Sequence, residues 1–171
     1  MFAEKMGYSG DELDDIHRIA LLHDIGKIST PIDILNKPGK LTDDEFKIMK
    51  QHAANGYEIL KGITVMPNLA LGAGYHHERI DGKGYPKGLK GDEIPEIAQI
   101  IAVADCLDAM TSTRPYRKAM PLSKAISIIT EIAGTQLSQK VVDIFLQLVD
   151  EGAFDELRAE TEGPAEEEEK K

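Results

Sequence analysis

Apolar residues recur along most of this chain at intervals of three and four positions, the spacing that places them on one face of an α-helix. The first such segment ends at an adjacent histidine and aspartate, His23 and Asp24. Thr42 precedes Glu45 by three positions, a capping-box pattern that predicts a helix extending to about Leu60. Further helices are expected from Pro67 to His76 and over residues 96–111, 121–133 and 138–149. Because strand-like alternation is almost absent, the pattern predicts an all-α bundle.

Two connectors interrupt the helical pattern. Residues 31–40 form a turn-rich segment, and residues 77–95 form a long loop that contains four glycines and two prolines. Loops of that length inside a compact domain are usually functional or disordered. The longer loop is therefore a candidate part of a functional site.

Composition indicates one domain with an acidic end. The chain has 171 residues, 42% of them apolar, which is enough for one hydrophobic core. Its net charge is −10, and residues 155–171 supply −5 of this through eight acidic and three basic side chains. We expect a domain over residues 1–154 and an acidic, disordered tail over 155–171. The acidic balance argues against DNA binding, and an anionic substrate would need metal ions or a few well-placed Lys and Arg side chains.

The sequence also indicates a cellular compartment. Cys106 is the only cysteine, which rules out an intrachain disulfide and fits a reducing environment. Residues 1–10 show no secretory signal, and no apolar run approaches the roughly 20 residues that a membrane helix needs. We expect a cytoplasmic protein without membrane insertion.

Four histidines and two aspartates occupy positions that core packing does not explain. They lie at helix ends or within apolar helices: His23, Asp24, His52, His76, His77 and Asp105. Asp105 has apolar neighbours and is expected to be buried, which is costly for a carboxylate unless it is paired or bound to a metal. Imidazole and carboxylate donors from separate helices are typical of iron or manganese sites, with zinc as an alternative. Taken alone, an aspartate in such a position would more often be a structural hydrogen-bonding residue than a metal ligand.

Seven short motifs combine these residues with glycine, lysine and arginine. They are HDIGK at 23–27, ILNKPG at 34–39, HHER at 76–79, DGKGYP at 81–86, VAD at 103–105, DAMT at 108–111 and RPYR at 114–117. Together they resemble the HD-GYP family, a branch of the HD metal-dependent phosphohydrolases, over roughly residues 16–149. The resemblance implies an all-α HD-domain helical bundle with a long glycine-rich GYP loop. It also implies hydrolysis of cyclic di-GMP to pGpG or GMP with two divalent metal ions, iron or manganese, or alternatively zinc, nickel or magnesium.

The resemblance divides the six candidate ligands between two metals. The first metal would be bound by His52, His76 and His77, and the second by His23 and Asp105, with Asp24 bridging both. Family members carry a further helix with a histidine about thirty residues upstream, whereas only 22 residues precede His23 here. The second metal would therefore lack one ligand, and no third metal is expected.

Four further residues would contact the reacting groups or the substrate. Lys27 would act beside the catalytic Asp24 by contacting a bridging hydroxide or a phosphate oxygen, and Arg114 and Arg117 would bind phosphate. Tyr85 would stack on guanine. The alternative for the two arginines is a solvated pair without a ligand. The alternatives for the turn that contains Tyr85 are a plain surface loop and a docking surface for diguanylate cyclase (GGDEF) domains.

The absence of the upstream helix has wider consequences. It should expose an apolar groove that a second copy could fill in a homodimer. We expect the chain to be an excerpt of a longer bacterial protein or a truncated product, with a receiver or sensor domain preceding it, as in a response regulator.

The leading hypothesis is a metal-dependent cyclic di-GMP phosphodiesterase in bacterial second-messenger signalling. One alternative is a non-catalytic HD-GYP module that binds nucleotide or a diguanylate cyclase partner. The other is a phosphohydrolase for another cyclic dinucleotide.

Overall fold

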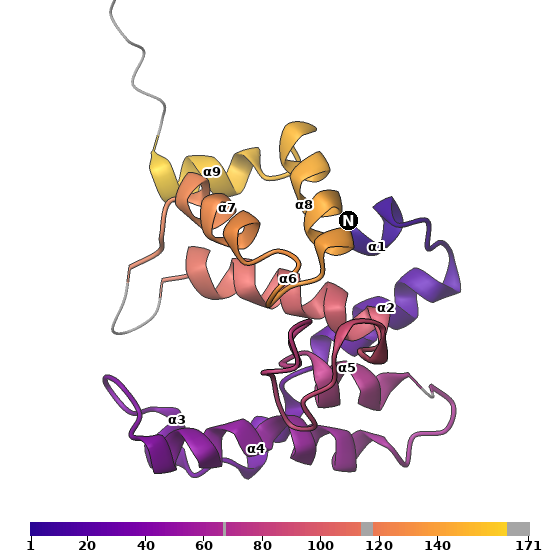
Figure 1. The fold of residues 1–171 in the computed structure, drawn as a ribbon, viewed down its shortest axis with the longest axis vertical. Coiled ribbons are helices and arrows are strands. Elements are labelled where there is room, and N and C mark those ends of the chain that lie inside the picture. The colour runs from indigo at the N-terminus through magenta and orange to yellow at the C-terminus, as the bar shows by residue number, and fades with distance from the viewer. Residues whose placement is uncertain (67, 114–117, 164–171) are drawn as a thin grey trace, which may run out of the picture.

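The computed structural model describes residues 1–66, 68–113 and 118–163, and within these ranges the chain forms a helical bundle without a β-sheet (Figure 1). The helices are α1 Phe2–Lys5, α2 Asp11–Leu21, η1 Ile25–Ser29, α3 Ile32–Leu35, α4 Asp43–Leu60, α5 Leu69–Tyr75, η2 Gly91–Glu93, α6 Glu96–Thr111, α7 Leu122–Glu131, α8 Gln139–Asp150 and α9 Asp155–Glu162, where η denotes a 3-10 helix. The predicted all-α fold is confirmed. No helix in these ranges combines the length and apolar character needed to cross a bilayer.

Helix α6 lies between two groups of helices, because apolar side chains cover most of its surface. On one side Val103 and Leu107 belong to a cluster with α7 and α8 that includes the fully buried Leu122 and Phe145. On the other side Ile101 joins a second cluster with α2, α4 and α5. Figure 1 shows α7, α8 and α9 above α6, and α4 and α5 below it. Helix α6 thus connects the C-terminal helices to the part of the molecule that carries the candidate ligands.

Several predicted boundaries are confirmed. Helix α4 begins at the capping box, where the Thr42 N–H donates to Glu45 Oε2 (2.7 Å) and the Glu45 N–H donates to Thr42 Oγ1 (3.3 Å). Helix α6 spans the predicted residues 96–111. Ser138 occupies the N-cap position of α8, but its side chain makes no capping hydrogen bond. Pro67 lies outside the described residues, and α5 begins at Leu69.

The acidic segment differs from the prediction. Residues 155–162 form helix α9, where a disordered tail was expected. Leu157 packs against the main core cluster, which anchors this helix. Thr161 Oγ1 accepts from the Leu122 N–H (3.2 Å) and Glu162 Oε1 accepts from the Ser123 N–H (2.6 Å), so α9 satisfies two free donors at the start of α7. The remaining part of the predicted tail, residues 164–171, lies outside the described residues.

Candidate metal centre

Three segments of the chain converge between α2, α4 and α5. Helix α2 leads into His23 and Asp24, α4 carries His52, and α5 ends immediately before His76 and His77. The structure therefore brings five of the six predicted ligands together from three different helices.

Gly26 allows the chain after Asp24 to lie directly on α4. A Cβ atom at this position would come within 1.9 Å of the backbone oxygen of His52 and 2.5 Å of the amide nitrogen of Gly56. Glycine alone fits without a shift, because every other residue carries a Cβ. This close approach of η1 to α4 holds Asp24 beside His52.

One carboxylate oxygen of Asp24 faces a set of histidines. Asp24, His52, His76 and His77 each offer a ligand atom, and these four atoms all lie within 4.8 Å of one another. Asp24 Oδ1 is 3.4 Å from His52 Nε2 and 3.9 Å from His76 Nε2. The group matches the ligand set expected for the first metal.

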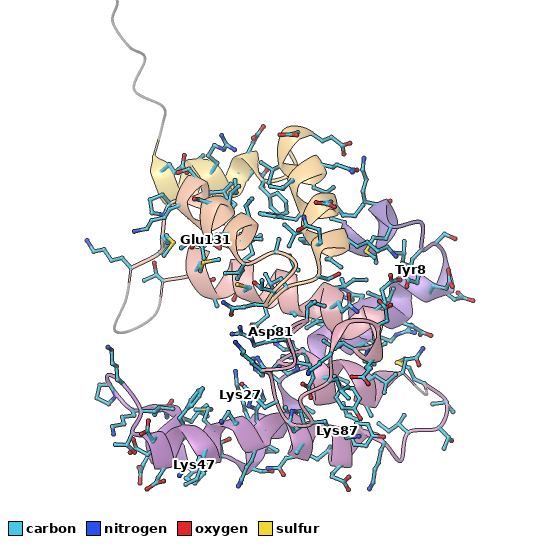
Figure 2. All side chains as sticks on the ribbon, viewed as in Figure 1. Tyr8, Lys27, Lys47, Asp81, Lys87 and Glu131 are labelled. Atoms are coloured by element: carbon cyan, nitrogen blue, oxygen red, sulfur yellow. The ribbon has the colours of Figure 1, made fainter. Side chains whose placement is uncertain are left out.

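The other oxygen of Asp24 faces a second set of residues. Asp24 Oδ2 lies 3.4 Å from His23 Nε2 and forms an ion pair with Lys27. His23 Nε2 is in turn 3.9 Å from Asp105 Oδ1 on α6. Figure 2 shows Lys27 next to α4, on the side that faces α6. The two oxygens of one carboxylate thus point toward two different groups of ligand atoms.

The proton positions on the histidines are set by the backbone. In His23, His52 and His76 the Nδ1 nitrogen lies 2.6–3.1 Å from a carbonyl oxygen of the preceding turn. A carbonyl oxygen can only accept, so Nδ1 carries a proton in all three rings. In His52 and His76, where burial lowers the pKa, Nε2 therefore presents its lone pair to the cluster, whereas His23 Nε2 donates to Asp24 Oδ2. Three of these inward atoms, Asp24 Oδ1, His52 Nε2 and His76 Nε2, are buried without a hydrogen-bond partner among the described residues. Buried acceptors that face one another are costly without a shared cation, so the cluster suits a divalent metal ion.

Burial and charge keep the cluster in its metal-binding protonation state. Burial lowers the pKa of His76 to about 4 and that of His77 to about 2, and it also lowers the pKa of His52. Burial opposes ionisation of Asp24, but hydrogen bonds from His23 and Lys27 outweigh it and hold the pKa of this carboxyl well below its usual range. At neutral pH the imidazoles of His52, His76 and His77 are therefore neutral and surround a carboxylate.

The glycine-rich loop folds back over the cluster. The Tyr85 N–H donates to the His77 carbonyl (3.2 Å), and the Tyr85 ring stacks on the His77 ring with centroids 4.8 Å apart. A Cβ on Gly84 would lie 2.4 Å from the Arg79 amide nitrogen and 2.6 Å from the His77 oxygen, so this turn also requires glycine. Tyr85, predicted to stack on guanine, thus has one ring face against a candidate ligand.

Glu78 anchors the far side of this loop, a role that the sequence analysis did not assign. Its side chain is buried, with 4% of the residue exposed. Its carboxylate accepts three backbone N–H groups, from Lys87 (2.7 Å), Gly88 (3.2 Å) and Leu89 (2.9 Å). The sequence signal was an acidic residue directly after two ligand histidines, but its loop partners lie nine to eleven positions away.

The sequence profile of the HD domain family matches residues 1–141. This chain belongs to the HD domain family. A cyclic di-GMP phosphodiesterase of Thermotoga maritima is 50% identical over 149 residues, which cover 85% of this HD domain chain and 40% of that relative. A 3′3′-cGAMP-specific phosphodiesterase of Vibrio cholerae is 44% identical over 131 residues, covering 77% of this chain and 28% of that relative.

The comparison with solved structures supports the same fold. An HDG"Y"P protein from Bdellovibrio bacteriovorus superposes with a TM-score of 0.68 at 19% identity, over 87% of this chain and 48% of that one. The resemblance to the HD-GYP family is thereby confirmed. The chain spans less than half the length of these relatives.

Asp105 is more accessible in this HD domain than its apolar neighbours suggested. The expectation of burial is wrong, because 30% of its side chain is exposed. It faces a groove of about 540 Å³, lined mostly by apolar residues of α1, α2 and α6, which also reaches His23. An apolar groove in the bundle was expected from the sequence, and its filling by a second copy stays a prediction. Arg114 and Arg117, predicted to bind phosphate, lie outside the described residues.

We expect the metal-free HD domain to lose stability as the pH falls from 7 toward 5. The pKa of His76 is about 4 when folded, against 6.5 ordinarily, so below pH 6.5 the unfolded chain binds more protons and acid favours unfolding. His52 and His77 act in the same direction, and His23, whose pKa is raised mainly by its hydrogen bond to Asp24, acts in the opposite one. At about 1.4 kcal/mol per pKa unit, we expect the free energy of unfolding to fall by roughly 3 kcal/mol between pH 7 and pH 5, which lowers the Tm by several degrees.

Thermal unfolding in EDTA across this pH range measures the effect. A Tm that stays constant or rises between pH 7 and pH 5 would show that the imidazoles of His52, His76 and His77 are not held neutral.

Replacing Glu78 with glutamine should loosen the glycine-rich loop. The amide offers one accepting oxygen and places its NH₂ against a backbone donor, so at least one of the three anchoring bonds is lost, at about 1.5–3 kcal/mol for a bond to a charged group. We expect hydrogen exchange of the Lys87, Gly88 and Leu89 amides to accelerate at least about tenfold, as measured by NMR. The matched control is Glu93→Gln, which alters one exposed bond to the Lys90 N–H. Equal exchange in the two variants would refute the anchoring role.

Proposed function

We propose that this HD domain hydrolyses a phosphodiester bond of a cyclic dinucleotide, with cyclic di-GMP as the first candidate substrate. The observation that carries the proposal is the placement of Asp24, whose Oδ1 faces His52 and His76 while its Oδ2 faces His23. A carboxylate shared between two groups of ligands suits two adjacent metal ions. Relatives named for cyclic di-GMP and 3′3′-cGAMP hydrolysis support the substrate class.

The ligands divide into two sets in this proposal. His52, His76, His77 and Asp24 would hold one metal ion, and His23 and Asp105, together with Asp24, would hold the second. Nitrogen and carboxylate donors without thiolate favour iron or manganese. When bound, the metal ions supply Lewis-acid activation of the phosphodiester and of the attacking water.

The protein's own residues position and stabilise the reacting groups. The backbone carbonyls that accept from the Nδ1–H groups fix the orientation of the histidine rings before any substrate binds. Lys27 reaches the cluster at Asp24 Oδ2, where its ammonium can neutralise negative charge that develops on a phosphate oxygen. Tyr85 and Glu78 shape the loop beside the cluster, with the Tyr85 ring packed against His77. Hydrolysis of one diester bond opens the ring and yields pGpG, and a second cleavage would yield GMP.

Cyclic di-GMP and 3′3′-cGAMP are distinguished by direct competition. The chain, loaded anaerobically with Fe(II) or Mn(II), is given equal concentrations of both dinucleotides, and the products are followed by chromatography. Faster loss of cyclic di-GMP supports the proposal, whereas faster loss of 3′3′-cGAMP assigns the hybrid dinucleotide as substrate. No turnover of either one with metal bound favours a non-catalytic binding module.

Partners and context remain predictions. A GGDEF domain that docks on the loop, a receiver or sensor domain in the same protein, and a homodimer are each consistent with the resemblance. In this structure the Tyr85 ring faces the cluster, so a docking partner would contact the outer, lysine-containing part of the loop, where Figure 2 labels Lys87.

A further inference from the structure

Lys50 places a half-buried cation at the rim of the metal centre. It lies on α4, two positions before His52, and its Nζ is 5.2 Å from the centre of the Phe46 ring and 5.6 Å from the centre of the Tyr85 ring. The Tyr85 ring stacks on His77. One aromatic ring therefore separates the Lys50 ammonium from a candidate metal ligand.

The Lys50 ammonium has no acidic partner within the described ranges of the chain. No ion pair or hydrogen bond to its Nζ is found there, and its contacts are with the two aromatic rings. Other lysines near the cluster are engaged, since Lys27 pairs with Asp24 and Lys87 donates to the Tyr75 hydroxyl (2.7 Å). In a chain with a net charge of −10, a cation held in place by rings and left without a counter-ion is available to an anion.

The second phosphate of a cyclic dinucleotide is an anion of this kind. Such a ligand carries two phosphodiester groups, and only one of them can react at the metal centre at a time. We propose that Lys50 binds the phosphate that is not being cleaved, with Phe46 and Tyr85 holding its ammonium in position. This inference rests on the proposed function, and it assigns to α4 a substrate-binding role in addition to carrying His52.

Lys50→Met tests the proposal, because methionine fills a similar space against the two rings but carries no charge. Two substrates are compared on metal-loaded protein: cyclic di-GMP, and bis(p-nitrophenyl) phosphate, which has a single phosphodiester. We expect the KM for cyclic di-GMP to rise about tenfold with kcat within about twofold, the typical loss for one charge-assisted contact at a partly exposed site. Metal content and hydrolysis of bis(p-nitrophenyl) phosphate should stay unchanged.

Two further variants separate charge from structure. Lys50→Arg keeps the charge and should stay within about threefold of the unaltered KM. Lys47 lies on the same helix, pairs with Asp44 and is located at the outer edge of the molecule (Figure 2). The control variant Lys47→Met should therefore leave the KM unchanged. An unchanged KM in Lys50→Met would overturn the proposal. A parallel loss with both substrates, or loss of bound metal, would also overturn it, because Lys50 would then support the metal centre.

Failure of the proposed function is visible separately. If the unaltered chain with bound metal cleaves bis(p-nitrophenyl) phosphate but not cyclic di-GMP, or cleaves neither, the proposed function fails. The Lys50 inference is then decided by anisotropy of fluorescently labelled cyclic di-GMP on the metal-free chain. A dissociation constant about tenfold higher for Lys50→Met supports it, and equal constants, or no binding to the unaltered chain, refute it.

Discussion

Replacing Asp24 with alanine is expected to reduce phosphodiester hydrolysis at least about 10³-fold and to lower the bound metal content. The reason is that this one carboxylate contributes to both groups of ligands, with Oδ1 3.4 Å from His52 Nε2 and Oδ2 3.4 Å from His23 Nε2. Removing it takes a donor from each group and frees Lys27 from its ion pair. Losing even one oriented electrostatic contact to a transition state typically costs 10²–10³ in rate, so loss of a shared ligand should cost more.

The control for this variant is Asp33→Ala. Asp33 is an exposed acid on α3, and the substitution makes the same change in net charge. It should leave turnover and metal content unaltered. Turnover of the Asp24 variant within tenfold of the unaltered chain would rule out a shared carboxylate as the basis of the activity.

Replacing Gly26 with alanine should damage both the stability and the metal centre. The added Cβ would lie 1.9 Å from the His52 oxygen, so η1 must move away from α4 and carry Asp24 with it. Overpacking of this kind costs about 1–3 kcal/mol, and more when the opposing atoms are backbone. We also expect metal affinity to fall by about 10–100-fold, the usual effect of disturbing the groups that orient metal ligands.

Gly62→Ala is the matched control for this effect. No atom lies within 4 Å of the position that a Cβ would take on Gly62, so the same change in composition adds no contact. Chemical denaturation measures the stability of the two variants, and metal titration measures their metal affinity. The difference between the variants gives the contribution of the close approach of η1 to α4. Equal stability and equal metal affinity in both would show that this approach does not hold the centre together.

The candidate ligands were predictable from the sequence because each residue type, at its own position, already indicates a metal ligand. Histidine and aspartate at helix ends are hard to explain by packing, and His52, His76 and His77 are found grouped around Asp24. The sequence pattern also predicted α6, since a helix that is apolar on most faces has to be buried.

Other features depend on contacts between distant segments, which periodicity does not reveal. Helix α9 contains few apolar residues, and its anchoring depends on Leu157 and on hydrogen bonds across thirty-nine positions to α7. The four-residue helix α3 lies in a segment that was expected to be a turn-rich connector, and it is too short for an apolar repeat to show. The anchoring of the loop by Glu78 and the exposure of Asp105 at a groove likewise follow from the packing of several helices.

The most direct test of the central claim measures metal content and turnover on one sample. The purified chain is loaded anaerobically with Fe(II) or Mn(II), freed of excess metal, and analysed for bound metal and for cleavage of cyclic di-GMP. We predict about two metal ions per chain together with formation of pGpG. Two bound metal ions without any cleavage of cyclic di-GMP or 3′3′-cGAMP would contradict the proposed hydrolysis. Cleavage by a chain that contains no metal would contradict a catalytic metal centre built on Asp24.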